Sequence, residues 1–397
     1  MRWSFEELKR LETDCPCGEP HHAIPVERLE VGPGALDEAA TWIKARFGRV
    51  VLVMDEHTRL AAGDALAQRL TDLGVVWTAC IVEPNGQGDV VADEASIVQV
   101  LIACGPDVEA LIAVGSGTLH DIARFASAKM RIPFVSVPTA PSVDGFTSAG
   151  APLIVRGVKT TYQTHAPVAV FADTAVLEQA PKELVWAGFG DVLGKSTSLA
   201  DWAFGALAAG EPYCSHLASL TREALETAVA EVRGLAEGRP DAIRHLMEAL
   251  LLSGLVMLLF GQSHPASGGE HHLSHDWEME FLRSGRRQIL HGLKVAVACG
   301  VLADLYRSRV EEAVAAAVEA GLAPWASLAG REHEVRAIVA SVPPGDRVRA
   351  LMRQLGAPAE PEDLGIERSL VSSSLKRAHK LRNRYTMLRL LNDTNAI

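Results

Sequence analysis

Short apolar runs alternate with amphipathic helical patterns along the first half of the chain. The runs are apolar at nearly every position, which is typical of strands buried on both faces of a parallel sheet. They lie at residues 49–56, 77–84, 109–117 and 132–139. Helical patterns fill the gaps, at about 36–47, 59–73, 91–104 and 118–130. This alternation predicts βαβ units that build a mainly parallel sheet.

Two further elements are expected before the pattern changes. Residues 151–164 predict a hairpin with Arg156–Gly157 at its turn, and residues 167–173 predict one more strand. From about residue 181 onward the apolar positions recur with a period near 3.6, which predicts helices. These helices are expected at 181–208, 216–236, 240–262, 270–283, 289–320, 331–341, 345–355, 366–378 and 380–393. We therefore divide the chain into an α/β domain, residues 1–180, and an all-helical domain, residues 181–397, with the site in the cleft between them.

Composition and charge narrow the class of protein. The chain has 397 residues and a net charge of −11, which argues against nucleic acid as a partner. The longest apolar run, residues 249–260, contains Ser253 and Gly254 and is shorter than a membrane span needs, so we expect no membrane span. The six cysteines are widely scattered, as reduced thiols are, and the charged N-terminus does not resemble a signal peptide. A cytoplasmic protein is expected.

Two glycine-containing loops follow predicted strands. In AVGSGTLHDIARF, residues 113–125, Gly115 and Gly117 would let backbone amides approach a diphosphate at a helix N-terminus. A plain tight turn is the alternative, because the sequence is not the six-position dinucleotide fingerprint. VPTAPSVDGFTSAGAP, residues 137–152, adds small polar residues at the same edge of the sheet. Asp55 ends an earlier strand, where a carboxylate can accept ribose hydroxyls or simply cap a helix.

The second half contains the residues of a divalent cation site. In GEHHLSHDWEMEF, His271 and His275 are four residues apart and can face one cleft. His291 precedes Gly292 at the start of an apolar helix, and Asp191 lies among several glycines, which are costly inside a helix unless something must approach its backbone. One carboxylate and two imidazoles suit an open divalent site. By spacing alone, His271 and His275 could also bind the metal as a pair.

The motifs GSGTLHD, PTAPSVDGFTS, AGFGDVLGK, SHPASGGEHHLSHDWEMEF and ILHG, in this order, resemble the sn-glycerol-1-phosphate dehydrogenase family, in particular its bacterial AraM-like branch. The resemblance runs from about residue 25 to the C-terminus. It implies a dehydroquinate synthase-like fold, with a Rossmann-like α/β dinucleotide-binding domain followed by an all-α domain that binds metal and substrate. It also implies these cofactor contacts: Asp55, Gly117, Thr118, Leu119, His120, Asp121, Thr139, Ala140, Pro141, Ser142 and Ser148.

The same resemblance assigns the remaining site residues. It makes Asp191, His271 and His291 the metal ligands, and it places Asp144, Asp191 and His275 against the substrate. This separates the two outer histidines of EHHLSH, which spacing alone had left as a pair. Asp191 and His275 are the residues expected to take part in catalysis, with His275 relaying the proton and a water molecule as the alternative.

The implied reaction is reduction of dihydroxyacetone phosphate to sn-glycerol 1-phosphate, and its reverse, with NAD(H) or NADP(H) and one divalent ion, nickel or zinc. The resemblance further implies a homodimer and a role in the synthesis of ether-type phospholipids. A glycerol or other polyol dehydrogenase, a dehydroquinate synthase-like lyase and a non-catalytic metal- or cofactor-binding regulator are the alternatives. The substrate phosphate has no assigned ligand among the basic residues near the site in sequence, which are Lys195, Arg283, Arg286, Arg287 and Lys294. Lys195 follows Asp191 by one turn and can pair with it.

Some clusters are not expected to have a role. CPCGEPHH, residues 15–22, offers two cysteines and two histidines, but no second CxC or HxH follows, so a structural metal is not expected there. His57, His120, His165 and His264 are expected at the surface or in loops, although the resemblance also gives His120 a cofactor contact. Glu278 and Glu280 are expected on a solvated helix face.

Overall fold

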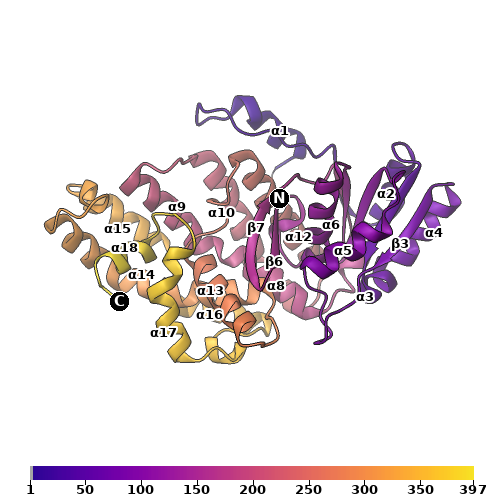
Figure 1. Cartoon of the computed structure of the whole chain (residues 1–397). Coiled ribbons are helices and arrows are strands. Elements are labelled where there is room, and N and C mark those ends of the chain that lie inside the picture. The colour runs from indigo at the N-terminus through magenta and orange to yellow at the C-terminus, as the bar shows by residue number, and fades with distance from the viewer. Residues whose placement is uncertain (1–2) are drawn as a thin grey trace.

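A six-stranded parallel sheet forms the N-terminal half of the molecule, in a computed structural model that describes residues 3–397 (Figure 1). The strands follow the spatial order β1-β8-β5-β4-β2-β3, and every pairing is parallel. The strands are β1 (Arg28–Gly32), β2 (Arg49–Met54), β3 (Val76–Ile81), β4 (Ala110–Gly115), β5 (Phe134–Pro138) and β8 (Ala169–Asp173). The predicted parallel sheet is confirmed, but β1 was not predicted. It is an edge strand that pairs only with β8 and is half-exposed, so it lacks a continuous apolar run.

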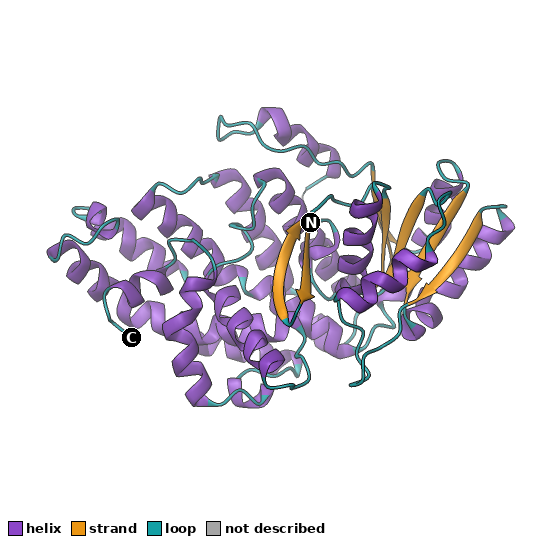
Figure 2. Ribbon diagram, viewed as in Figure 1, coloured by secondary structure: helices purple, strands orange, loops and turns teal. Residues whose placement is uncertain are grey.

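Helices cover both faces of this sheet (Figure 2). Side chains of β2 alternate between two cores: Leu52 packs in one cluster with residues of α2 and α4, and Val51 packs in another with residues of α5 and α6. This two-sided burial explains why the strands are apolar at nearly every position. The helical segments of this half are α2 (Ala35–Lys44), α3 (Glu56–Thr58), the π-helical turn η1 (Arg59–Gly63), α4 (Asp64–Asp72), α5 (Glu94–Ala103) and α6 (Gly117–Met130).

A separate two-stranded hairpin lies between the large sheet and the C-terminal helices (Figure 2). It consists of β6 (Gly150–Val155) and β7 (Val158–Gln163), which pair antiparallel, as predicted. Arg156 and Gly157 form the turn with φ values of 52° and 74°, which suits the left-handed backbone that tight hairpins require.

The C-terminal half is helical, as predicted, with short 3-10 turns between some helices. Two short helical segments precede it, η2 (Asp144–Phe146) and α7 (Thr174–Leu177). Its own segments are α8 (Lys182–Leu193), α9 (Lys195–Ala209), α10 (Ser215–Ala230), α11 (Val232–Ala236), α12 (Pro240–Phe260), α13 (Gly269–Arg283), α14 (His291–Glu319), η3 (Trp325–Leu328), α15 (Glu332–Ser341), α16 (Gly345–Leu355), η4 (Pro361–Leu364), α17 (Arg368–Arg377), η5 (Ala378–Leu381) and α18 (Met387–Asp393).

Three departures from the prediction matter for the site. The helix predicted over 181–208 is two helices, α8 and α9, which meet at Gly194. The helix predicted over 380–393 is wrong in its first half, because η5 ends at Leu381 and α18 begins only at Met387, where the Thr386 side chain accepts from the Arg389 amide. An additional helix, α1 (Phe5–Asp14), was not predicted; it begins with a capping box between Ser4 and Glu7 and buries only Leu8.

By length and composition alone, one helix in the described part of the chain, α12, could cross a membrane. Its apolar stretch is 67% buried inside the fold. Leu246, Leu250 and Val256 belong to the main core together with residues of α8 and α10. The apolar run that contains Ser253 and Gly254 is therefore the central core helix of the C-terminal half.

Candidate active site

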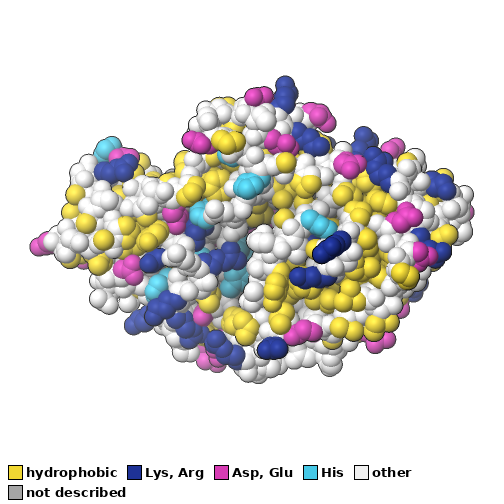
Figure 3. All heavy atoms as spheres, turned by 45° about the horizontal axis from the view of Figure 1, so that its top comes forward, with side chains coloured by type: hydrophobic (Ala, Val, Ile, Leu, Met, Phe, Trp, Pro, Cys, Tyr) yellow, Lys and Arg dark blue, Asp and Glu magenta, His cyan; other side chains and the backbone are white. Residues whose placement is uncertain are grey.

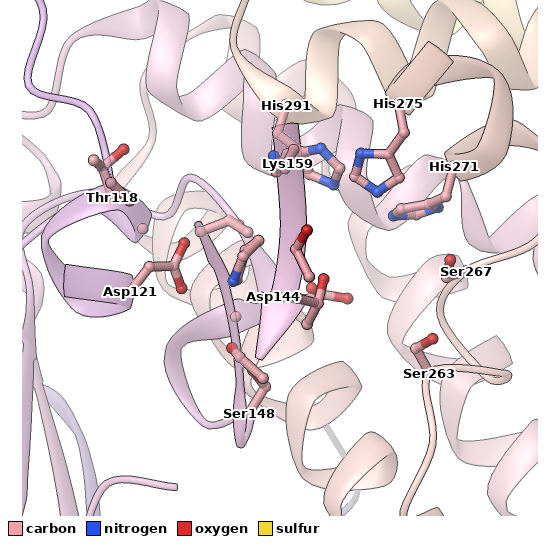
Figure 4. Close-up of a pocket in the computed structure, with 18 of the residues that line it drawn as sticks. Thr118, Asp121, Asp144, Ser148, Lys159, Ser263, Ser267, His271, His275 and His291 are labelled. Carbon is pink, nitrogen blue, oxygen red and sulfur yellow. The ribbon is translucent and has the colours of Figure 1, made fainter. Parts of the chain in front are cut away.

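A deep cavity of about 1160 Å³ opens between the carboxyl edge of the sheet, the β6–β7 hairpin and the C-terminal helices. The face of the molecule drawn in Figure 3 is hollowed near its middle, where histidine and basic side chains gather. Residues from both halves line the cavity: Thr118 and Asp121 lie at one end, and His271, His275 and His291 at the other (Figure 4). The volume exceeds that of most drug-sized ligand sites, which suits a dinucleotide together with a small substrate.

One end of the cavity is the turn between β4 and α6. β4 lies between β2 and β5 in the sheet. The chain continues from β2 to β3 on one side and from β4 to β5 on the other side, so the turn after β4 lies at a topological switch point, where ligands bind in sheets of this kind. Ser116, Gly117 and Thr118 line the cavity. A Cβ atom on Gly117 would come within 2.6 Å of Val143, so only glycine lets the two loops close together here. The first amides of α6 have no side-chain cap, so they are available to an anionic ligand.

The second loop completes this end of the cavity. Ser142, Asp144 and Ser148 line it, and the buried Ser142 hydroxyl has no hydrogen-bond partner among residues 3–397. Asp121 also lines it and accepts a hydrogen bond of 2.7 Å from the fully buried Arg124. Because Arg124 neutralises this carboxylate, Asp121 can lie beside a diphosphate with little charge repulsion.

Other residues expected to touch the cofactor lie away from the cavity wall. Leu119 and Ala140 are core residues, and Thr139 and Pro141 lie behind the loop surface. The expectation that His120 lies at the surface or in a loop is wrong: it is on α6, fully buried, and lies 2.7 Å from the Ser136 hydroxyl. Asp55 caps α3 by accepting from the Thr58 amide at 2.8 Å, which is the alternative role that the sequence left open.

The other end of the cavity carries a cluster of metal-ligating side chains. Asp191, His271 and His291 each offer one ligand atom, and these atoms all lie within 4.8 Å of one another. Nδ1 of His271 lies 2.8 Å from a carboxylate oxygen of the fully buried Glu270, and its Nε2 lies 3.8 Å from Asp191. Because an ionised carboxylate only accepts hydrogen bonds, Nδ1 of His271 donates to Glu270, and this contact orients Nε2 toward the cluster.

His275 lies beside this cluster but is not a member of it among the described residues. Its ring centroid is 6.2 Å from that of His271 and 5.6 Å from that of His291. The three imidazoles point toward one another from above Asp144 (Figure 4). The geometry thus separates the two outer histidines of EHHLSH, which the spacing alone allowed to act as a pair.

Close helix contacts at glycine bring these side chains together. A Cβ atom on Gly292 would lie 1.7 Å from the Ala187 carbonyl oxygen, and one on Gly190 would lie 2.3 Å from the Gly292 carbonyl oxygen. On the neighbouring face of α8, a Cβ atom on Gly188 would lie 1.8 Å from the Pro141 carbonyl oxygen. The costly helical glycines around Asp191 and His291 are therefore the contact points at which α8, α14 and the loop that contains Pro141 meet.

A buried lysine holds the two acids of the site. Nζ of Lys195 lies 2.7 Å from Asp144 and 3.1 Å from Asp191, and the Asp144 amide donates to Asp191 at 3.0 Å. Burial lowers the pKa of Lys195, but the two carboxylates more than offset this and raise it above its usual value. The pairing with Asp191 that the sequence suggested is present, and Asp144 shares it.

A second ionic group surrounds His275. The expectation that Glu278 lies on a solvated helix face is wrong: it is buried, lies 2.9 Å from Lys159 of β7 and 3.4 Å from Lys294 of α14, and accepts from Nδ1 of His275 at 3.2 Å. Burial raises the pKa of Glu278, but Lys159 and Lys294 together hold it well below its usual range. Burial lowers the pKa of His275 to about 3, so this imidazole is neutral, with its proton on Nδ1. Glu280 is half-exposed, which is closer to the solvated position expected for it.

A basic residue that the sequence did not single out also lines the cavity. Arg382 lies in the extended segment between η5 and α18 and donates to Ser263 at 3.0 Å. Within residues 3–397 it has no carboxylate within ion-pair distance, whereas Lys159 pairs with Glu278. The basic residues close in sequence do not reach the cavity: Arg283, Arg286 and Arg287 bind Glu280, the Gly365 carbonyl and Asp89, and Lys195 and Lys294 are buried among acids.

Comparison with known proteins identifies the family of this chain. Residues 30–181 match the family model of iron-containing alcohol dehydrogenases. The chain is 48% identical to the glycerol-1-phosphate dehydrogenase [NAD(P)+] of Geobacillus stearothermophilus, over 99% of both chains. It is 45% identical to the enzyme of the same name from Geobacillus thermodenitrificans, over 99% of this chain and 98% of that one.

The fold is shared with more distant proteins of known structure. Glycerol dehydrogenase from Schizosaccharomyces pombe superposes with a TM-score of 0.68 at 18% identity, covering 94% of this chain and 88% of that chain. This similarity concerns the fold alone, whereas the identity to the Geobacillus proteins extends over the full length. The chain belongs to the family of glycerol-1-phosphate dehydrogenases.

Proposed function

We propose that this chain is an NAD(P)-dependent oxidoreductase that reduces dihydroxyacetone phosphate to sn-glycerol 1-phosphate, and catalyses the reverse reaction. The observation that carries the proposal is one continuous cavity lined by three kinds of ligand-binding group. An uncapped helix N-terminus lies at one end, a carboxylate–imidazole cluster at the other, and an arginine without a carboxylate partner among the described residues lies on the wall.

The cofactor is assigned to the β4–α6 end. Gly117, Thr118 and Asp121 would contact the diphosphate with Ser142 and Ser148, and the Ser142 hydroxyl would gain the partner that it lacks. Leu119, His120, Thr139, Ala140 and Pro141 would support these loops from behind. Asp55 would contact the adenosine ribose through the carboxylate oxygen that does not cap α3.

The donor set fits one divalent cation held by Asp191, His271 and His291. Two imidazoles and a carboxylate suit nickel or zinc, and Nδ1 of His291 is buried without a hydrogen-bond partner among the described residues. When bound, the dinucleotide supplies the hydride and the cation acts as a Lewis acid toward the carbonyl. Glu270 fixes the orientation of His271, and Lys195 fixes that of Asp191 and Asp144.

His275 is the proposed proton relay and substrate contact. Its neutral ring has the proton on Nδ1, so Nε2 can accept a proton from the hydroxyl of glycerol 1-phosphate and return it during reduction. Asp144 and Asp191 would lie against the substrate hydroxyls. The phosphate is assigned to Arg382, because a cation without a carboxylate partner favours an anionic ligand.

The remaining assignments extend the proposal to the whole protein. Residues 1–180 would bind the dinucleotide and residues 181–397 the metal and the substrate. We infer a cytoplasmic homodimer whose product enters the synthesis of ether-type phospholipids. A polyol dehydrogenase would not need Arg382, and a lyase or a regulator would not consume reduced cofactor.

An activity assay on the purified protein can distinguish these functions. Oxidation of NADH and NADPH should be followed with dihydroxyacetone phosphate, glyceraldehyde phosphate and dihydroxyacetone in turn, with nickel, with zinc and after chelation. Turnover that requires both the phosphate and an added metal is expected. Equal rates with dihydroxyacetone would indicate a polyol dehydrogenase, and no oxidation with any carbonyl substrate would indicate a regulator.

A further inference from the structure

A second group of metal-ligating side chains lies at the N-terminal segment. Cys15, Cys17, His21 and Cys214 each offer one ligand atom, and all four atoms lie within 4.8 Å of one another. Three of them come from the segment after α1, and Cys214 is the residue that precedes α10. The stretch CPCGEPHH contains three of the four ligands, but the fourth, Cys214, is distant from them in the sequence.

The distances match a tetrahedral zinc site. Sγ of Cys15 and Sγ of Cys214 are 3.7 Å apart, and Sγ of Cys17 is 3.4 Å from Nε2 of His21. Zinc bonds of about 2.3 Å to sulfur and about 2.0 Å to nitrogen place tetrahedral ligand pairs about 3.8 Å and 3.5 Å apart. A disulfide would require sulfur atoms about 2.05 Å apart, and all six cysteines are free.

Backbone amides point at two of the sulfur atoms. The Leu217 amide, in the first turn of α10, donates to Sγ of Cys214 at 3.4 Å, and the Glu19 amide donates to Sγ of Cys17 at 3.5 Å. Such amides stabilise thiolates, which are the form that binds metal. Cys15 and Cys214 are buried, whereas Cys17 and His21 are half-buried, so the group lies just beneath the surface and is closed on its inner side.

We propose that Cys15, Cys17, His21 and Cys214 bind one structural zinc ion that fastens the N-terminal segment to α10. Four protein ligands leave no position for a substrate, which is typical of structural rather than catalytic sites. The other attachments of the segment are mainly apolar, through Leu8 and Ile24 in the main core, so a zinc ion would add a cross-link to α10. Directly after the ligands, His22, Ala23 and Pro25 line the active-site cavity, so the zinc would also fix part of the cavity rim.

The two sites can be emptied separately, which keeps this proposal independent of the proposed function. His271→Ala removes a ligand of the active-site cluster and leaves the four ligands near α10 intact. This variant, purified under reducing conditions, should retain about one tightly bound zinc per chain by elemental analysis, whereas the wild type should hold one further divalent ion, nickel or zinc. After chelation, Co²⁺ should give it the sulfur-to-cobalt charge-transfer absorption of a thiolate site.

Cys17→Ser and His21→Gln, each combined with His271→Ala, test the two ligands that are only half-buried. Each should abolish the thiolate absorption and the remaining zinc, and Cys104→Ser, at a half-buried cysteine outside the group, should change neither. Cys214→Ser serves as a second measurement from the other element. Four results would each overturn the proposal. The first two are absence of zinc from the His271→Ala protein and cobalt spectra of it without thiolate bands. The others are a Cys15–Cys214 disulfide in the purified protein and full zinc content in the Cys17 and His21 variants.

Discussion

Glu270 accepts a 2.8 Å hydrogen bond from Nδ1 of His271, its direct neighbour on α13, and the same carboxylate accepts a 2.6 Å hydrogen bond from the Thr197 hydroxyl. Glu270 is fully buried and faces away from the cavity, so its effect on the site passes through His271. The first turn of α13 thus supplies both a candidate ligand and the group that orients it.

Replacing Glu270 by Gln should weaken metal binding at the active site by about 10- to 100-fold, because the amide orients the imidazole less well and lowers its basicity. The measurement is the metal concentration that restores half of the activity to chelated protein. Glu280→Gln, on the exposed part of the same helix, is the control and should behave as wild type. Equal metal affinity in both variants would contradict the role given to Glu270.

Removing either proposed imidazole ligand, as His271→Ala or His291→Ala, should abolish turnover and lower the metal content by about one ion per chain, since two protein ligands rarely hold a divalent ion. Elemental analysis of purified, folded protein checks the metal, and circular dichroism checks the fold. Near-normal activity in either variant would rule out the Asp191–His271–His291 assignment.

His275→Gln should retain the metal but lose turnover by about 10²- to 10⁴-fold, the range typical of general acid–base groups. The reason is that His275 lies beside the cluster, with its Nδ1 held by Glu278 at 3.2 Å. Single-turnover kinetics together with metal analysis separate the two effects. Loss of the metal in this variant would instead favour the His271–His275 pair as ligands.

Arg382→Gln should raise KM for dihydroxyacetone phosphate by about 10- to 150-fold, which corresponds to the loss of about 1.5–3 kcal/mol from a charged hydrogen bond. The effect on dihydroxyacetone, which has no phosphate, should be small. Arg283→Gln, whose side chain binds Glu280 outside the cavity, is the matched control. An unchanged KM for the phosphorylated substrate would place the phosphate elsewhere.

Gly292→Ala should destabilise the fold by about 1–3 kcal/mol or more, because its Cβ atom would lie 1.7 Å from the Ala187 carbonyl oxygen. The displacement of α14 should also weaken metal binding through His291. Gly300→Ala, on the same helix, meets no atom closer than 3.7 Å and should stabilise the protein by about 0.5–1 kcal/mol. Thermal unfolding of both variants checks the contrast, and equal melting temperatures would contradict it.

The local pattern of apolar and polar residues was sufficient to predict most of the helices and strands. The strands β2, β4, β5 and β8 are apolar on both faces because helices cover both sides of the sheet, and this burial leaves a continuous apolar run in the sequence. The edge strand β1 escaped prediction because half-exposed residues leave no such run. The first half of the helix predicted at 380–393 was wrong because period alone did not reveal that a new helix begins after the cap at Thr386.

The sequence by itself determined the kinds of residue at the site and the helices and loops that carry them: glycine loops at strand ends, and one acid and several imidazoles beside helical glycines. Only the tertiary structure decided which of these meet. It buried Glu278 against Lys159, 119 residues away, turned Arg382 into the cavity, and brought Cys214 within 3.7 Å of Cys15, 199 residues away. The physical reason is that hydrophobic period reports only which side of an element is buried, whereas a binding site depends on contacts between elements that are distant in the chain.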